Sequence, residues 1–211
     1  MPPVVPNPKN IRGFRSEAAF ELWLSRNHNR VTELWLRIYK KATGKPTVTY
    51  QEALDVALCW GWIDGLRKGH DEESFVQRFT PRKAKSIWSQ VNQGHVARLR
   101  AAKRMTEHGE RHVAAAEADG RWAAAYAPIR AASHATVPAD LRAAIGKNAR
   151  ARAKFGTLRK GNLFALTFRV NNMKTDAGRK KKIADLVAML ARGETILPGP
   201  ALAKKAAAKK K

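Results

Sequence analysis

Seven aromatic, charged and amide residues between positions 60 and 92 carry the side chains best suited to binding a small ligand. Flat aromatic rings stack on bases or sugars, and guanidinium groups bind phosphate or carboxylate through two hydrogen bonds. The residues of this predicted ligand pocket are Trp60, Trp62, Asp64, Arg78, Arg82, Trp88 and Asn92. A structural role is the alternative, because tryptophans are strongly buried on average and Asp64 with Arg78 has the chemistry of a cross-strand ion pair.

A second group of candidates is cationic and lies in the last third of the chain. Residues 138–211 hold 19 basic and 4 acidic side chains, whereas residues 1–80 hold 12 and 9. The run 179–182 is expected to begin the last helix, where four positive charges oppose the helix dipole unless an anion offsets them. We expect that anion to be a polyanion, most plausibly nucleic acid. The predicted contacts are Arg169, Lys174, Arg179, Lys180, Lys181, Lys182, Lys204, Lys205, Lys209, Lys210 and Lys211. A solvated surface that carries no ligand is the alternative.

Other reactive side chains do not form a recognisable catalytic or metal-binding motif. His108 and His112 have the spacing of a helical metal pair, but Gly109 weakens the helix and no third ligand is evident. Cys59 follows Leu58 in an apolar stretch, so we expect a buried structural thiol. No glycine-rich phosphate loop or dinucleotide fingerprint occurs. We therefore expect no metal, no cofactor and no catalytic residues.

Composition and charge limit the class of protein. The chain has 211 residues, with 41 Lys and Arg against 17 Asp and Glu, for a formal net charge of +24. Its 44% hydrophobic content is enough to bury a core, and no window has the roughly 18 apolar residues that a membrane span needs. Residues 1–8 lack the basic and apolar regions of a secretory signal, so we expect a cytoplasmic protein.

Hydrophobic periodicity predicts the elements that position these candidates. A helix from Ser16 to about His28 is followed by an alternating strand over 33–39. Thr49 and Glu52 form a capping box that opens a helix, and the runs 62–68 and 74–79 form a hairpin. Everything after this hairpin has helical spacing. The sequence therefore predicts an α+β fold, with a small, mostly antiparallel sheet and flanking helices followed by an all-helical unit.

The same patterns divide the chain into four parts. We expect an extended lead-in over 1–13, an α+β domain over 14–127, a helical C-terminal domain over 137–196, and a disordered Lys-rich tail over 197–211.

Five segments of unusual composition carry a family resemblance. They are Leu34-Trp-Leu-Arg-Ile-Tyr-Lys-Lys41, Thr49-Tyr-Gln-Glu-Ala-Leu54, Cys59-Trp-Gly-Trp-Ile-Asp-Gly65, Gln77-Arg-Phe-Thr-Pro-Arg82 and Ser86-Ile-Trp-Ser-Gln-Val-Asn92. In these segments the chain resembles the bacterial YdeI/OmpD-associated family, whose members are also described as bacteriocin-protection proteins. The resemblance extends from about Phe14 to Ile196.

The resemblance implies a biological context rather than a reaction. The family names point to cell-envelope stress or bacteriocin tolerance, and no catalytic residue carries over to this chain. Together with the charge, this favours a non-enzymatic, polyanion-binding protein. A small-ligand-binding protein or enzyme that uses the aromatic and arginine cluster is the alternative, and a contact with an envelope-related protein is a further possibility.

Overall fold

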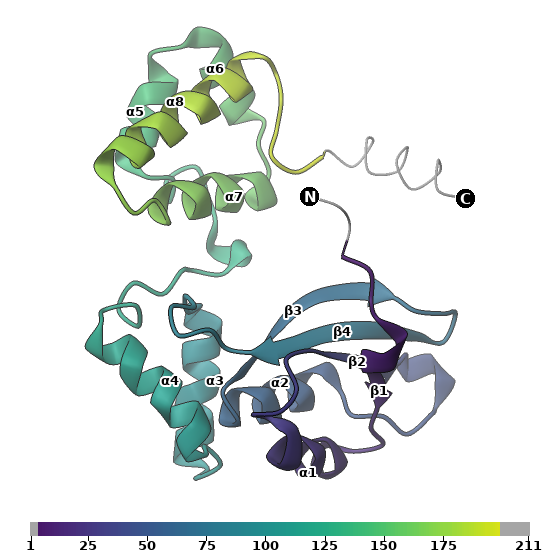
Figure 1. Ribbon diagram of the computed structural model, residues 1–211. Helices are drawn as coiled ribbons and strands as arrows, with labels where there is room; N and C mark the ends of the chain where they lie inside the picture. The colour runs from purple at the N-terminus through teal and green to yellow at the C-terminus, as the bar shows by residue number, and fades with distance from the viewer. Residues whose placement is uncertain (1–3, 199–211) are drawn as a thin grey trace. The chain divides into compact units, whose positions relative to one another are not determined.

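The computed structural model describes residues 4–198, and the chain forms two compact units, Met1–Ala125 and Tyr126–Lys211 (Figure 1). Among the described residues, the first unit combines a sheet with helices and the second contains helices only. The predicted α+β class with a helical C-terminal part is thus confirmed. The predicted tail lies outside the described residues from position 199 onward.

The described part of the first unit contains a four-stranded sheet in the spatial order β1-β2-β4-β3. Strands β2 (Leu34–Tyr39), β4 (Ser74–Pro81) and β3 (Trp62–Gly69) pair in antiparallel fashion. Strand β1 (Ile11–Gly13) pairs in parallel with β2, so the sheet is mixed but mostly antiparallel. Part of the expected lead-in therefore belongs to the sheet, entering it after the short 3-10 helix η1 (Pro8–Asn10).

Alternation along β2 explains how the sheet acquires an apolar face. Leu34, Leu36 and Ile38 are buried in the core that the sheet shares with α1 and α2. Successive side chains of a strand point to opposite faces, so these three lie on one side. Phe79 of β4 stands opposite Leu34 and joins the same core. The 3-10 helix η2 (Lys41–Thr43) follows the strand.

Local capping sets where the first two helices begin. The Ser16 side chain accepts a backbone hydrogen bond at the start of α1 (Glu17–Asn27). At the start of α2 (Tyr50–Cys59), Thr49 and Glu52 each accept the other's backbone N–H, as the predicted capping box requires. Both N-termini are therefore fixed by residues that the sequence identifies.

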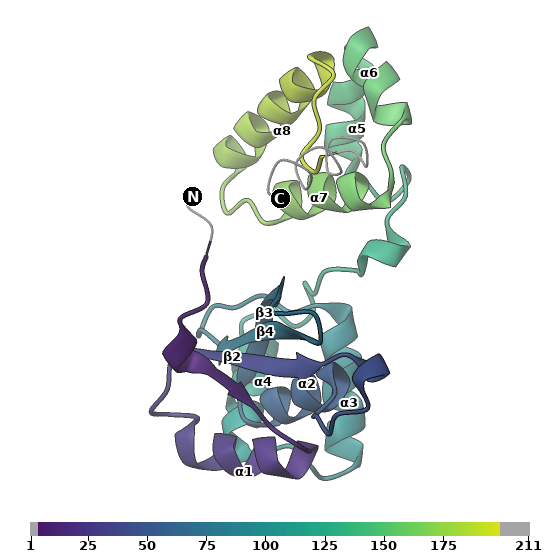
Figure 2. The same cartoon turned by 90° about the vertical axis from the view of Figure 1, so that its right-hand side faces the viewer.

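Helix α2 lies between the sheet and a second pair of helices, α3 (Gln90–Ala101) and α4 (Glu107–Ala118) (Figure 2). Its seven residues from Ala53 to Cys59 are all buried. Ala53, Val56 and Ala57 face the core shared with the sheet, whereas Leu54, Leu58 and Cys59 face the core shared with α3 and α4. One helix thus supplies both cores of the first unit.

The C-terminal unit packs its helices around a separate apolar core. Its described helical elements are η3 (Ile129–Ala131), α5 (Ala139–Gly146), α6 (Ala149–Gly156), α7 (Lys160–Asn171) and α8 (Asp176–Ala191). Helix α8 contacts α5, α6 and α7, and its Leu186 and Leu190 meet Leu141, Ile145 and Leu166 in the core. No helix within residues 4–198 is long and apolar enough to cross a membrane.

The close approach of α4 to the end of α2 predicts intolerance of any side chain at Gly109. A Cβ atom there would meet the carbonyl oxygens of Cys59 at 2.5 Å and Leu58 at 2.6 Å. We expect Gly109→Ala to lower the free energy of unfolding by about 1–3 kcal/mol, as overpacking typically does. Urea denaturation followed by circular dichroism measures this change.

Gly94 of α3 is the matched control, because a Cβ there meets nothing within 4 Å. Gly94→Ala should raise the free energy of unfolding by about 0.5–1 kcal/mol, since alanine restricts the unfolded chain. Equal effects of the two substitutions would contradict the packing described for α2 and α4.

Candidate functional site

Three of the seven residues of the predicted ligand pocket are buried in the first unit. Trp62 and Trp88 each expose 1% of their surface and Arg82 exposes 5%. Trp62 belongs to the core beneath the sheet and donates its indole N–H to the His28 carbonyl at 3.1 Å. Trp88 belongs instead to the core between α2, α3 and α4. The two tryptophans thus stabilise different parts of the fold.

Arg82 and Trp88 are a pair from the predicted pocket that the structure brings into contact. The Arg82 guanidinium carbon lies 3.6 Å from the Trp88 ring centroid, and its Nη1 donates to the Ile87 carbonyl at 3.1 Å. The Trp88 ring also meets the Trp122 ring edge-on, with the two ring centroids 4.8 Å apart. A cation stacked on an aromatic ring and withdrawn from water is a strong local contact.

Arg78 and Asp64 belong to separate polar interactions. Arg78 Nε donates to Glu33 at 2.5 Å, and Asp64 accepts a hydrogen bond from the Tyr50 hydroxyl at 2.8 Å. In the strand register Asp64 stands opposite Phe79, so the cross-strand ion pair considered for Asp64 and Arg78 does not form. Burial raises the pKa of Glu33, but the hydrogen bonds from Arg78 and Asn10 and the charge of Arg78 together outweigh it, so this pKa lies below its ordinary value.

The remaining two residues of the predicted pocket also have structural contacts. Asn92 lies in the first turn of α3, where its backbone N–H donates to the Ser89 side chain. Trp60 caps the end of α2, and its ring stacks on the His108 ring with the centroids 5.5 Å apart. The centroid of the His28 ring lies 5.1 Å from that of Trp60 and 4.1 Å from that of His108. Sequence reasoning missed this three-ring cluster, because all three rings are far apart in the chain.

The histidines of α4 are held in a cationic setting. His108 Nδ1 lies 2.7 Å from Arg111 Nη2, so the ring nitrogen accepts a hydrogen bond from an arginine. His112 packs against Gly61, which follows the C-cap residue of α2 and has a φ of 71°. Among the described residues, no group of three or more His, Cys, Asp or Glu side chains is arranged to hold a metal ion.

Cys59 is fully buried at the end of α2. Burial raises the pKa of its thiol to about 11. The thiolate that a nucleophile needs is therefore disfavoured near neutral pH. This agrees with the predicted structural role.

The start of α8 differs from the expectation that Arg179 opens this helix. The helix begins at Asp176, and the Thr175 side chain caps it by accepting the Gly178 N–H. Asp176 therefore occupies the first turn, where a carboxylate interacts favourably with the helix dipole. Arg179 completes the first turn and Lys180, Lys181 and Lys182 lie in the second, so the prediction that the run 179–182 begins the helix is wrong.

Arg179 also has an internal partner. Its Nε and Nη2 donate to the two Asp140 oxygens at 2.7 and 3.0 Å, and its Nη1 donates to the Val170 carbonyl at 3.0 Å. This paired arrangement joins α8 to α5 and to the end of α7, and it lowers the pKa of Asp140 chiefly through the hydrogen bond from Arg179. Arg179 thus has a structural role that the sequence did not reveal.

The other predicted cations of the described C-terminal unit lie at the surface. Arg169, Lys174, Lys180 and Lys181 are exposed and Lys182 is half-buried. None of these five belongs to an ion pair formed within residues 4–198. The predicted contacts Lys204, Lys205, Lys209, Lys210 and Lys211 lie outside the described residues.

Three aromatic side chains of the C-terminal unit form a cluster that sequence reasoning did not identify. Phe164 and Phe168 stand one turn apart on α7 with ring centroids 5.5 Å apart, and Tyr126 packs edge-on against them at 6.0 and 5.2 Å. All three are half-buried. Lys160 precedes Phe164 by four residues and is exposed, so a cation extends the same helical stripe. The spacing of Phe164 and Phe168, four residues apart, is the sequence feature that could have indicated this cluster.

Two family models match the chain. Residues 134–193 match the family described as bacteriocin-protection, YdeI or OmpD-associated. Residues 12–112 match a domain of unknown function, DUF8412. The first match confirms the family resemblance on the helical unit, whereas the motifs between 33 and 92 fall within the second match. No curated protein and no solved structure matches the chain.

The histidines of α4 predict that the protein loses stability in mild acid. Burial lowers the pKa of His108 and of His112, and the charges of His28 and Arg82 respectively add to this effect. The unfolded chain therefore binds protons more readily, so the free energy of unfolding should fall as the pH drops through about 6.5. Urea midpoints measured between about pH 8 and pH 5.5 report this slope.

The variant His112→Gln should flatten this pH dependence, whatever it does to the stability at pH 8. The same substitution at His70, on the loop between β3 and β4, is the control. A slope that His112→Gln and His70→Gln change equally would contradict the assignment.

Proposed function

We propose that the helical unit, whose residues 134–193 match the family described as bacteriocin-protection, YdeI or OmpD-associated, binds a polyanion, and that nucleic acid is its ligand. The proposal also places the protein in the cytoplasm and assigns it no catalytic reaction. It rests on the charges of the helical unit rather than on the family name. Lysine and arginine contacts to phosphates supply most of the affinity in non-specific nucleic-acid binding.

The observation that carries the proposal is the shortage of carboxylates in the cationic unit. Only 4 acidic residues lie within 138–211. Asp140 is already paired with Arg179, and Glu194 with Arg192 at 2.8 Å. The other two, Asp176 and Asp185, are exposed on α8, and neither forms an ion pair with Lys174, Lys180, Lys181 or Lys182 among the described residues. A phosphate backbone is a partner that supplies many such charges at regular spacing.

Three lysines of α8 provide the densest part of this surface. Lys180 and Lys181 are exposed and Lys182 is half-buried, one after another on the helix. Because α8 turns by about 100° per residue, the three ammonium groups fan out around its solvent side. Arg169, near the end of α7, and Lys174, in the following loop, precede them in the sequence. Arg179 is left out of this surface, since it holds α8 to α5.

The aromatic cluster on α7 favours single-stranded nucleic acid over duplex. Bases of a single strand stack on aromatic side chains, and cations beside the rings hold the backbone. Phe164 and Phe168 are half-buried, and Lys160 and Arg169 beside them are exposed. Phe168 and Tyr126 lie outside the set of side chains packed on the core of the unit, so their contacts with Phe164 form a surface cluster.

The small-ligand alternative at the hairpin has less support. Trp62, Trp88 and Arg82 are enclosed by the cores of the first unit, where they leave no exposed ring face for a ligand. The family description supports a contact with an envelope-related protein as a second proposal. Such a contact should survive deletion of residues 199–211 and high salt, whereas charge-driven capture should not.

The polyanion proposal predicts salt-dependent affinity. Fluorescence anisotropy with labelled single-stranded DNA, single-stranded RNA and duplex DNA of about 20 nucleotides measures the dissociation constant between about 50 and 300 mM salt. Its logarithm should change linearly with the logarithm of salt, and single strands should bind more tightly. Replacing Lys180, Lys181 and Lys182 by Gln should reduce the slope by about 2–3, because each lost phosphate contact removes about one.

A matched control removes the same charge from the first unit. Lys41, Lys83 and Lys103 are exposed there, and their joint replacement by Gln should leave affinity and slope nearly unchanged. Affinity that does not respond to salt, or that the two triple variants reduce equally, would contradict a surface on α8. Deletion of 199–211 separately measures what the tail lysines add.

A further inference from the structure

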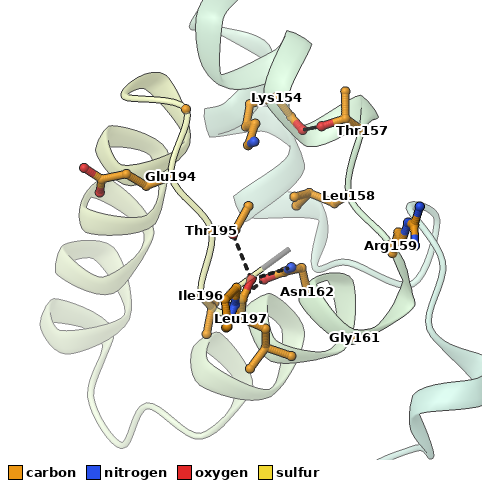
Figure 3. Close-up of a pocket in the computed structure, with 12 residues that line it drawn as sticks. Lys154, Thr157, Leu158, Arg159, Gly161, Asn162, Glu194, Thr195, Ile196 and Leu197 are labelled. Atoms are coloured by element: carbon orange, nitrogen blue, oxygen red, sulfur yellow. Dashed lines mark hydrogen bonds between the residues drawn. The ribbon is translucent and has the colours of Figure 1, made fainter. Parts of the chain in front are cut away.

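A pocket of about 800 Å³ lies within the C-terminal unit, between the turn that joins α6 to α7 and the segment that follows α8 (Figure 3). This volume falls in the range of small-molecule sites in proteins. None of the seven hairpin residues contributes to it. The lining residues are Lys154, Thr157, Leu158, Arg159, Gly161, Asn162, Gly193, Glu194, Thr195, Ile196, Leu197 and Pro198.

Specific hydrogen bonds hold the pocket open by fixing the segment after α8. The Asn162 amide on the first turn of α7 accepts the Leu197 N–H at 2.9 Å and donates to the Leu197 carbonyl at 3.2 Å. The Thr195 hydroxyl donates to the same carbonyl at 2.8 Å. A side chain that bonds both backbone groups of one residue fixes the position of that residue. The segment therefore forms a wall of the pocket before any ligand arrives.

A glycine at position 161 allows the close contact of this wall with α7. A Cβ atom on Gly161 would lie 3.3 Å from Leu197 Cδ1, which is tighter than ordinary packing. Without that Cβ, Leu197 approaches α7 and Ile196 packs against the core of the unit. Both side chains then line the pocket together with Leu158, which is buried. The lining is thus aliphatic in its middle.

Most polar side chains around this aliphatic lining are engaged elsewhere, but the side chains of the two cations Lys154 and Arg159 have no hydrogen bond or ion pair within residues 4–198. Thr157 donates its hydroxyl to the Lys154 carbonyl at 2.8 Å, and Glu194 pairs with Arg192 at 2.8 Å. Figure 3 shows the Glu194 carboxylate directed away from the hollow and the Lys154 side chain directed from α6 toward it. No hydrogen bond or ion pair of the Lys154 amine occurs within residues 4–198.

We propose that this pocket binds a small molecule with an apolar body and one anionic group, such as a medium-chain carboxylate. Leu158, Ile196 and Leu197 would contact the hydrocarbon part, and Lys154 would bind the carboxylate. An ammonium group beside apolar surface favours such a ligand over a neutral one, because an ion pair partly shielded from water is stronger than one in bulk solvent. The site is independent of the polyanion surface on α8.

The test uses 1-anilinonaphthalene-8-sulfonate as a fluorescent probe and octanoate as its competitor. On the full chain the probe should brighten at a saturable site and be displaced by octanoate. Octanamide, which has the same chain length but no charge, should compete about tenfold less well. Lys154→Met should weaken octanoate about fivefold or more and leave octanamide unchanged.

Lys147→Met is the matched control, because Lys147 is exposed at the end of α5 and does not line the pocket. It should leave the competition by octanoate as in the unchanged chain. Equal competition by octanoate and octanamide would overturn the proposal, as would equal effects of Lys154→Met and Lys147→Met. A probe that shows no saturable binding would overturn it as well.

Discussion

The burial of α2 on both sides is the constraint on which the first unit depends. This helix packs against the sheet on one side and against two helices on the other. Its small residues face the sheet, and its leucines face α3 and α4. The buried Asp55 on this helix is stabilised because Arg98 of α3 donates to both of its oxygens, at 2.6 and 2.7 Å. Loss of the contacts on one side of α2 would expose the core on that side to water.

The same constraint decides the fate of the aromatic residues near the hairpin. The sheet core needs a large side chain at Trp62, and the core beyond α2 needs one at Trp88. Aromatic residues and arginines occur both in ligand pockets and in buried cores, so the residue type alone does not distinguish the two roles. The difference arises from which elements cover each ring, and here helices cover both.

Two of the four acids within 138–211 form ion pairs inside the C-terminal unit, whereas Lys180, Lys181 and Lys182 form none among the described residues. Arg179 donates hydrogen bonds to Asp140 and to the Val170 carbonyl, and these bonds stabilise the helix bundle. Its neighbours Lys180, Lys181 and Lys182 have no such partner in the described residues. The family match covers this unit. The unit therefore combines a conventional apolar core with an unbalanced surface charge, and its pocket lies where a hydrogen-bonded segment meets the start of α7.

The sequence alone determined the features that depend on near neighbours in the chain. The Ser16 cap, the Thr49 and Glu52 capping box, the alternation of β2 and the basic character of the last third all follow from residues within a few positions of one another. Only the tertiary structure decided the partners of charged side chains. Arg78 meets Glu33 across 45 positions, Arg179 meets Asp140 across 39, and Asn162 holds Leu197 across 35. Such pairings depend on how whole elements pack, and local spacing carries no record of that packing.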